Sequence, residues 1–175
     1  YGVLRADRIL SSTRSNMKTK STDSLKRIEG VIELEEMNIE TGKKTILEKH
    51  NLITQLLYNK LFGFMNADNV PIDCNSLNIT HLALGTGTTA VTSADTKLAA
   101  ELFRKGYTTK TQGIASFQTK VIISPTEAVG NIKEIGLFAN ATDTADSGTL
   151  LSRLLIDRQK TAVLQWTIIY TYMLT

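Results

Sequence analysis

Cysteine, histidine and long apolar runs are scarce in this sequence of 175 residues. The one cysteine, Cys74, cannot form a disulfide within the chain. With this single thiol, His50 and His81 are too few to provide the ligands of a typical structural zinc site. No apolar run reaches the about 18 residues that a membrane-spanning helix needs, and residues 1–27 lack the apolar centre of a signal peptide. We therefore expect a globular protein with no internal disulfide, no metal site, no export signal and no membrane partner.

Charge is divided unevenly along the chain, whose net charge is +3. Residues 1–27 hold seven basic and two acidic side chains, a net charge of +5, while the remaining residues hold 13 basic and 15 acidic side chains, a net charge of −2. The first segment has few large apolar residues, so it can bury little surface to offset the entropy lost on ordering. We expect a flexible basic arm, residues 1–27, ahead of one folded assembly domain, residues 28–175. The basic residues of the arm are Arg5, Arg8, Arg14, Lys18, Lys20, Lys26 and Arg27.

The length of this arm favours a role in binding a neighbouring molecule. Fully extended, 27 residues reach roughly 90 Å, whereas a folded domain of the remaining size has a radius of gyration of about 15 Å. A leader without any partner is the alternative. We do not expect nucleic acid as the partner, because the arm has no aromatic side chain beyond Tyr1 that could stack on bases.

Alternation of apolar and polar residues predicts strands through most of the chain after residue 27. In residues 28–36 the even positions up to Leu34 are apolar or glycine, and a turn at 38–43 returns the chain as a hairpin through 44–50. Residues 161–175 form the longest predicted strand, which is apolar enough to be central in a sheet. Further strands are expected at 79–84, 103–111, 114–124, 131–139 and 149–156.

One helix is expected at residues 51–64, because its apolar side chains fall on a single stripe. Asn51 or Thr54 could cap its start, and Gly63 could end it. The stripe consists of Ile53, Leu56, Leu57, Leu61 and Phe64.

Two other segments complete the predicted architecture. Residues 65–78 are polar and contain Pro71, which is typical of a long loop. Residues 93–102 predict one or two helical turns capped by Ser93 or Asp95. Strands outnumber helices by about eight to one or two, with turn signals between them. The sequence therefore predicts a mainly β fold: an antiparallel β-sandwich with one or two short helices and an extended N-terminal arm.

Residues 81–90 read HLALGTGTTA, in which Gly85, Gly87 and Ala90 have the spacing of a dinucleotide-binding loop. Such a loop needs a helix directly after its glycines and an acidic residue about 20 positions later. Here threonines follow the glycines, residues 106–110 contain no acid, and the next segments predict further strands. We interpret Gly85 and Gly87 as a turn with positive φ at a strand exit, and we expect neither a cofactor nor a small-molecule substrate.

The remaining reactive side chains do not form a catalytic set. A nucleophilic serine, threonine or cysteine needs a base beside it, but His81 lies in an apolar strand and His50 ends a charged one. Asp143 and Asp146 lie in a predicted loop tip without a pocket, and calcium binding there would lack a glycine-anchored series of ligands. The sequence therefore predicts a protein that is not an enzyme and has no catalytic residues.

Four pieces of the sequence occur in an order known from one protein family. They are NLIT at 51–54 ahead of a helix, HLALGTGTTAVTSADTKLAAELFRK at 81–105, NIKEIGLF at 131–138 and LLSRLLIDRQKT at 150–161. Together they resemble the N-terminal domain of bacteriophage tail-collar fibre proteins and related phage tail and baseplate structural proteins. The resemblance covers about residues 51–175.

The resemblance implies a β-rich module that attaches or assembles at the tail, baseplate, neck or collar of a virion put together in the host bacterial cytoplasm. In the fibre proteins a shaft and a receptor-binding tip follow, whereas this sequence stops at Thr175, so we expect an adaptor or decoration subunit. Its expected partners are other virion proteins and copies of itself. The alternative is a carbohydrate- or receptor-binding module of a tail fibre, although the loops at 66–78 and 139–148 lack the aromatic platforms usual in sugar sites.

Three residues within the four pieces that resemble the phage family have expected structural roles. Gly136 lies inside a strand, where glycine permits a bulge or close packing. Glu134 is an acid in an apolar strand, and Arg104 is a base at the start of another. We expect Glu134 and Arg104 to pair at the edge of the sandwich, because an unpaired, partly buried carboxylate is costly; two separately solvated side chains are the alternative.

Overall fold

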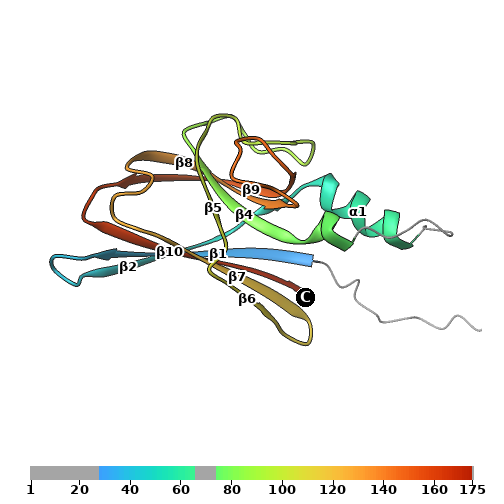
Figure 1. Ribbon diagram of the computed structural model, residues 1–175, viewed down its shortest axis with the longest axis horizontal. Helices are drawn as coiled ribbons and strands as arrows, with labels where there is room; N and C mark the ends of the chain where they lie inside the picture. Colours follow the sequence, from blue (N-terminus) through green and yellow to red (C-terminus); the bar gives the residue numbers. More distant parts are fainter. Residues whose placement is uncertain (1–27, 66–73, 175) are drawn as a thin grey trace, which may run out of the picture.

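The computed structural model describes residues 28–65 and 74–174, which form two antiparallel sheets packed face to face (Figure 1). The prediction of a mainly β, antiparallel sandwich is therefore confirmed, while the predicted arm at 1–27 lies outside the described residues. Sheet A consists, in spatial order, of β2 (Lys44–His50), β1 (Ile28–Asn38), β10 (Leu164–Leu174), β7 (Ser116–Ile123) and β6 (Thr109–Gln112). Sheet B consists of β3 (Leu52–Ile53), β9 (Thr149–Lys160), β8 (Gly130–Ala139), β4 (Ile79–Gly85) and β5 (Glu101–Gly106).

Period-two alternation places the core side chains of sheet A on one face. In β1, Ile32 and Leu34 are buried and the residues beside them are partly exposed. In β10, Trp166 and Ile168 are fully buried, and the same alternation continues as far as Tyr172. Strand β10 lies between β1 and β7, the central place that its composition predicts.

Strand β9, rather than β10, is the longest strand among the described residues. It has 12 residues, against 11 in β10. The apolar residues of β9 end at Ile156, but the backbone pairing with β8 continues until Lys160 lies opposite Gly130. Asp157 in this outer part is exposed and bonds to Lys133 of β8, which is a pairing that an apolar pattern cannot reveal.

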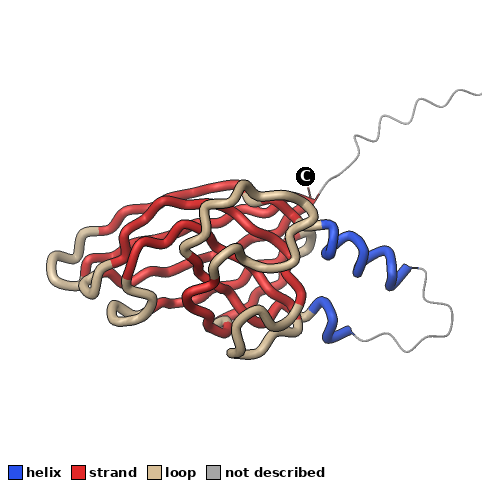
Figure 2. The backbone as a smooth tube through the Cα atoms, turned by 90° about the horizontal axis from the view of Figure 1, so that it is seen from above, coloured by secondary structure: helices blue, strands red, loops and turns tan. Residues whose placement is uncertain are grey.

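The predicted helix is present as α1 (Gln55–Met65), with different ends. Ile53 belongs to β3, and Gly63 lies inside the helix. Thr54 precedes the helix, but its hydroxyl donates to the carbonyl of Leu150 at 2.7 Å and so ties α1 to β9. The predicted loop at 65–78 ends in a short 3-10 helix, η1 (Cys74–Leu77), and both helices lie at one end of the sandwich (Figure 2).

The helical turns predicted at 93–102 are absent, because side chains hold this segment as an irregular loop, residues 86–100. Asp95 accepts hydrogen bonds from the amide and the hydroxyl of Thr92 at 3.1 and 2.7 Å, which fixes a turn. The amides of Ala99 and Ala100 donate to the carboxylate of Glu134 instead of to carbonyls one helical turn earlier. Strand β5 begins immediately afterwards, at Glu101.

The two sheets enclose the main core, and a smaller apolar cluster lies on the opposite face of sheet B. Leu82 and Leu84 of β4 belong to the main core, whereas Ala83 between them belongs to the small cluster. Leu98 of the 86–100 loop is buried in this cluster, so the loop covers the outer face of sheet B. The cluster consists of Ala83, Leu98, Phe138, Ala141 and Leu150.

Candidate functional site

Glu134 on β8 is fully buried on the outer face of sheet B, beneath the 86–100 loop. Its Oε1 accepts the amides of Gly87 at 3.0 Å and Ala100 at 2.8 Å. Its Oε2 accepts the amide of Ala99 at 3.0 Å and Nε of Arg153 at 2.8 Å. A carboxylate that accepts three backbone amides and one guanidinium satisfies polar groups that burial would otherwise leave unpaired. Glu134 therefore holds both ends of the loop on sheet B.

Gly85 and Gly87 make room for this carboxylate. Neither has the positive φ that we expected, which among the described glycines is confined to Gly42, Gly130 and Gly148. A Cβ atom on Gly85 would lie 2.5 Å from Oε1 of Glu134, and one on Gly87 would lie 2.4 Å from the same atom. The turn interpretation was therefore wrong about the backbone: these glycines are required by the close approach of a side chain.

Arg153 on β9 joins the loop to the same carboxylate. Its side chain is 2% exposed; Nη1 donates to Oδ2 of Asp95 at 2.7 Å and Nη2 to the carbonyl of Thr89 at 3.0 Å. Burial opposes the charge of Arg153, but its bonds to Asp95 and Glu134 outweigh this effect and raise its pKa. Burial likewise opposes ionisation of Asp95, and the bonds from Arg153 and Thr92 prevail and lower the pKa of its carboxyl. All three charged side chains of this network thus have partners within the protein.

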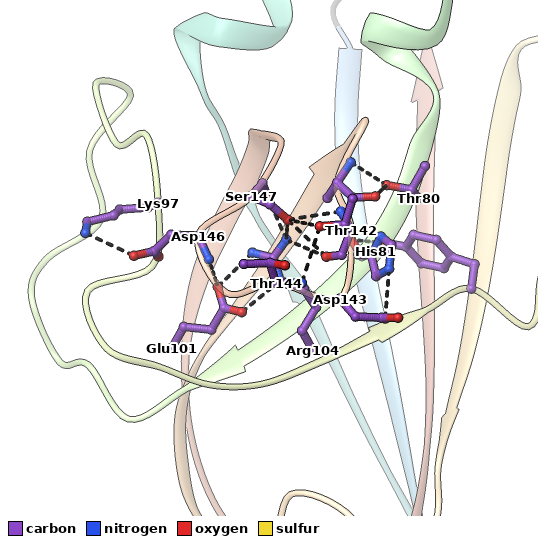
Figure 3. Close-up of polar contacts among 12 residues, drawn as sticks. Thr80, His81, Lys97, Glu101, Arg104, Thr142, Asp143, Thr144, Asp146 and Ser147 are labelled. Carbon is purple, nitrogen blue, oxygen red and sulfur yellow. Dashed lines mark hydrogen bonds and ion pairs between the residues drawn. The ribbon is translucent and has the colours of Figure 1, made fainter.

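Arg104 on β5 is the centre of a second network, drawn in Figure 3. Its Nε and Nη2 donate to the two carboxylate oxygens of Glu101, each at 2.8 Å. Its Nη1 donates to the carbonyl of Ser147 at 2.8 Å, and the guanidinium lies 4.3 Å from the ring centroid of Phe138. The expected pair between Arg104 and Glu134 is therefore wrong, because each side chain has a different and closer partner.

This second network fixes the 140–148 loop between β8 and β9. Ser147 accepts the amide of Thr142 at 3.0 Å, and the amide of Asp146 donates to Glu101 at 3.3 Å (Figure 3). Lys97 of the 86–100 loop bonds to the carboxylate of Asp146 at 3.1 Å, so the two loops are joined. The side chains drawn in Figure 3 bond to one another and to backbone groups, which is the arrangement of a structural clamp.

The contacts of His81 and Gly136 also indicate structural roles for these two residues. Nε2 of His81 lies 3.3 Å from Oδ1 of Asp143, an exposed carboxylate of the 140–148 loop. His50, at the end of β2, is exposed. Gly136 lies against the small apolar cluster, where a Cβ atom would come within 2.7 Å of Leu98. Close packing, one of the two expected reasons for this glycine, is thus what the structure has.

The sequence interpretation missed Arg153, Asp95 and Glu101. Arg153 could have been found by the argument that identified Glu134, because it is also a charge within a run of apolar residues. Glu101 lies three residues before Arg104 in sequence, a spacing that suggests a local pair. Nothing local identifies Asp95 as a partner of Arg153, since 58 residues separate them.

A different part of the molecule is hollowed and apolar. We call it the apolar end; it is the end where the described chain begins at Ile28 and where the C-terminus and α1 lie (Figures 1 and 2). One groove of about 410 Å³ lies between the start of β1, the end of β10 and the β6–β7 turn, and a second of about 360 Å³ lies between β1 and α1. Ile28 lines both grooves. Exposed side chains at this end include Leu52, Tyr58, Phe62, Ile114 and Leu174.

The fold and these contacts define an antiparallel β-sandwich with two clamped loops and one apolar end. No known protein family, curated protein or solved structure matches this chain. Among the described residues, no helix is long and apolar enough to cross a membrane. In the same residues, no group of three or more His, Cys, Asp or Glu side chains could hold a metal ion. Residues 1–27, which include all the basic residues of the arm, lie outside the part of the chain that the structure describes.

Proposed function

We propose that this protein is a non-enzymatic structural protein of a bacteriophage virion, an adaptor or decoration subunit at the tail, baseplate, neck or collar. It oligomerises and docks onto neighbouring virion proteins through its apolar end and the arm that joins the sandwich there. The observation that carries the proposal is the gathering of two grooves and several exposed apolar side chains around Ile28, the residue that directly follows the arm. Apolar patches of this kind mark surfaces that bind other proteins.

The two buried networks support a structural role. The charges of Glu134 and Arg153 are neutralised by each other and by the backbone, and Arg104 is neutralised by Glu101. These charged groups bond to partners within the protein and hold loops in place, which fits a rigid scaffold. The alternative, a carbohydrate-binding module, has no support from the 140–148 loop, where the hydroxyl of Thr142 bonds to that of Ser147 and the hydroxyl of Ser147 donates to the carbonyl of Thr142.

The exposed side chain of Ile114 gives the sharpest test of the apolar end. Ile114→Asp should leave the folded domain intact, because the side chain contributes no buried area, but should prevent incorporation into particles of the phage that encodes the chain. Ile39→Asp is the matched control, since Ile39 is 52% exposed in the β1–β2 turn at the opposite end. Both variants are measured by thermal unfolding and by quantifying the chain in purified particles.

Deletion of residues 1–27 tests the arm separately. The shortened chain should unfold at the temperature of the full chain, because the described core lies entirely after residue 27, yet it should be lost from particles. Absence of the full-length chain from purified particles would refute the proposal. Normal incorporation of both the deletion and Ile114→Asp would refute the docking role of this end.

A further inference from the structure

The outer face of sheet A, the face directed away from the core, differs from that of sheet B. On sheet B the outward side chains of Glu134 and Phe138 are buried beneath the 86–100 loop. On sheet A the outward residues of β1 and β10 are all partly exposed, among them Val31 and Ile169. Figure 1 shows the loops on the side of sheet B, with sheet A as the other outer layer. Within the described chain, the outer face of sheet A is therefore open.

Two carboxylates oppose each other on this open face. The register of β1 with β2 places Glu33 directly across from Glu48, and neither has an ion pair among the described residues. Directly opposed like charges on neighbouring strands destabilise a sheet. The other neighbour of Glu33 across the sheet is Ile169 of β10, which offers no neutralising charge. This position is thus suited to a cation from outside the sandwich.

The outer face of sheet A as a whole also carries more negative than positive side chains. Its charged side chains are four glutamates against two lysines, and one of these lysines, Lys44, already bonds to Glu35 at 3.0 Å. Half-exposed apolar side chains lie between the charges and could cover the stems of long basic side chains. The outward glutamates are Glu29, Glu33, Glu35 and Glu48, and the outward apolar residues include Val31, Ile46, Ile122, Ile169 and Met173.

We propose that the outer face of sheet A receives the basic arm, residues 1–27, of a second copy of this chain, with arm cations beside Glu33 and Glu48. The inference rests on the proposed function and names the partner of the arm. Charge complementarity supports it, because the arm has a net charge of +5 and the face has an excess of carboxylates. An arm that crosses between subunits fits head-to-tail association, in which the same contact repeats around a ring.

The direction of β1 favours a neighbour's face over the face of the same chain. Strand β1 runs from Ile28 at the apolar end toward the hairpin turn at 39–43, so residues 1–27 join the sandwich at the apolar end. To reach its own Glu33 and Glu48, the arm would have to reverse direction. In the proposed arrangement a second copy packs against the apolar end, where it also covers the two grooves.

Isotope-coded cross-linking tests this assignment on the full chain. Equal amounts of unlabelled and ¹⁵N-labelled protein are mixed in high salt, which screens the charges, dialysed into low salt and treated with a carbodiimide that joins lysines to carboxylates. We expect peptides that link Lys18, Lys20 or Lys26 to Glu33 or Glu48, with mixed labels in about half of them if copies exchange freely. Links with uniform labels only would show docking on the same chain and overturn the proposal, as would links to other acids only.

Charge reversal provides the second test. Glu48→Lys should weaken self-association at least about tenfold, measured by light scattering over a concentration series. Glu40→Lys is the control, because Glu40 is exposed in the β1–β2 turn and undergoes the same charge change. Reversal of Lys18 and Lys20 to glutamate should restore association of the Glu33→Lys, Glu48→Lys variant. A chain that is monomeric at all concentrations, or equal weakening by Glu48→Lys and Glu40→Lys, would overturn the proposal.

These outcomes separate the inference from the proposed function. If the deletion of residues 1–27 blocks incorporation into particles but no cross-links reach Glu33 or Glu48, the arm binds another virion protein and only the inference fails. If the full chain is absent from particles, the proposed function fails whatever the cross-links show.

Discussion

Glu134 of β8 and Arg153 of β9 form a buried ion pair across neighbouring strands, with 2.8 Å between Oε2 and Nε. The pair organises the outer face of sheet B, because the amides of Gly87, Ala99 and Ala100 also bond to the carboxylate. The 86–100 loop is therefore held by one side chain from each of two neighbouring strands, β8 and β9.

Replacement of Glu134 by glutamine should lower the free energy of unfolding by about 3–5 kcal/mol, the usual cost of leaving one member of a buried ion pair without its partner. The side-chain amide of the new glutamine would also place its N–H donors against the backbone amides and the guanidinium that donate to the carboxylate in the native chain. Urea unfolding followed by circular dichroism measures the loss. Glu40→Gln, in an exposed turn, should change the value by less than about 0.5 kcal/mol, and a similarly small effect of Glu134→Gln would contradict the clamp.

Substitution of Gly87 by alanine should cost about 1–3 kcal/mol, because the added methyl group would collide with Glu134 and force the carboxylate or the loop to move. Gly63→Ala is the matched control. Gly63 lies inside α1 with open space around it, so alanine should stabilise the protein by about 0.5–1 kcal/mol. Thermal unfolding should therefore show opposite signs for the two variants, and equal signs would argue against the steric role of Gly87.

The architecture of the sandwich follows from local patterns that the sequence displays directly. The alternation through β10 requires one buried face, and the length of the apolar run places the strand inside a sheet. The β1–β2 hairpin is equally local, since Gly42 with its positive φ lies in the turn between the two paired strands. Features of this kind depend on neighbours in sequence, so they can be predicted without the tertiary structure.

The clamps could not be predicted in the same way, because their partners are distant in sequence. Residues 93–102 have helix-forming composition, but the amides of Ala99 and Ala100 find an acceptor in Glu134, 35 and 34 residues away. That bond replaces the helical one and overrides the local preference. Glu134 was recognisable as a buried acid, whereas the choice of Arg153 over Arg104 depends on strand register, which a single sequence does not specify.

Lys160 should be a further determinant of stability, at the opposite end of β9 from the clamps. Its ammonium is buried, which lowers its pKa, and Nζ donates to the carbonyls of Ser124, Pro125 and Leu164 at 2.8, 3.0 and 2.9 Å. Lys160→Met would leave three carbonyls without this donor and should cost about 1–3 kcal/mol. Arginine should not rescue it, because a planar fork cannot replace three donors on one atom.

The control for Lys160 is Lys133, whose one described partner is the exposed carboxylate of Asp157. Lys133→Met should cost less than about 1 kcal/mol, the usual range for an exposed ion pair. Urea unfolding of both variants measures the difference. Equal losses would show that the three carbonyls are satisfied in another way when Lys160 is absent.

Acid should destabilise the protein through the carboxylates that hold its loops. Burial opposes ionisation of Asp95 and Glu127, but bonds from Arg153 and Thr92 to the first, and from Lys105 and Ser124 to the second, lower the pKa of each carboxyl. A folded-state pKa below the unfolded value contributes stability that is complete above the unfolded pKa of about 4 and is lost as the pH falls through the folded value.

Asp95→Asn should therefore be less stable than the native chain at pH 7, and the difference should shrink as the pH falls from about 4 through the lowered pKa of the native Asp95, where that carboxylate also becomes neutral. Urea unfolding at intervals from pH 7 to about pH 2.5 measures both curves. Glu40→Gln should instead give a curve parallel to that of the native chain, because Glu40 is exposed in a turn. A constant difference between Asp95→Asn and the native chain across this range would show that the charge of Asp95 contributes nothing to the hold of Arg153 on the 86–100 loop.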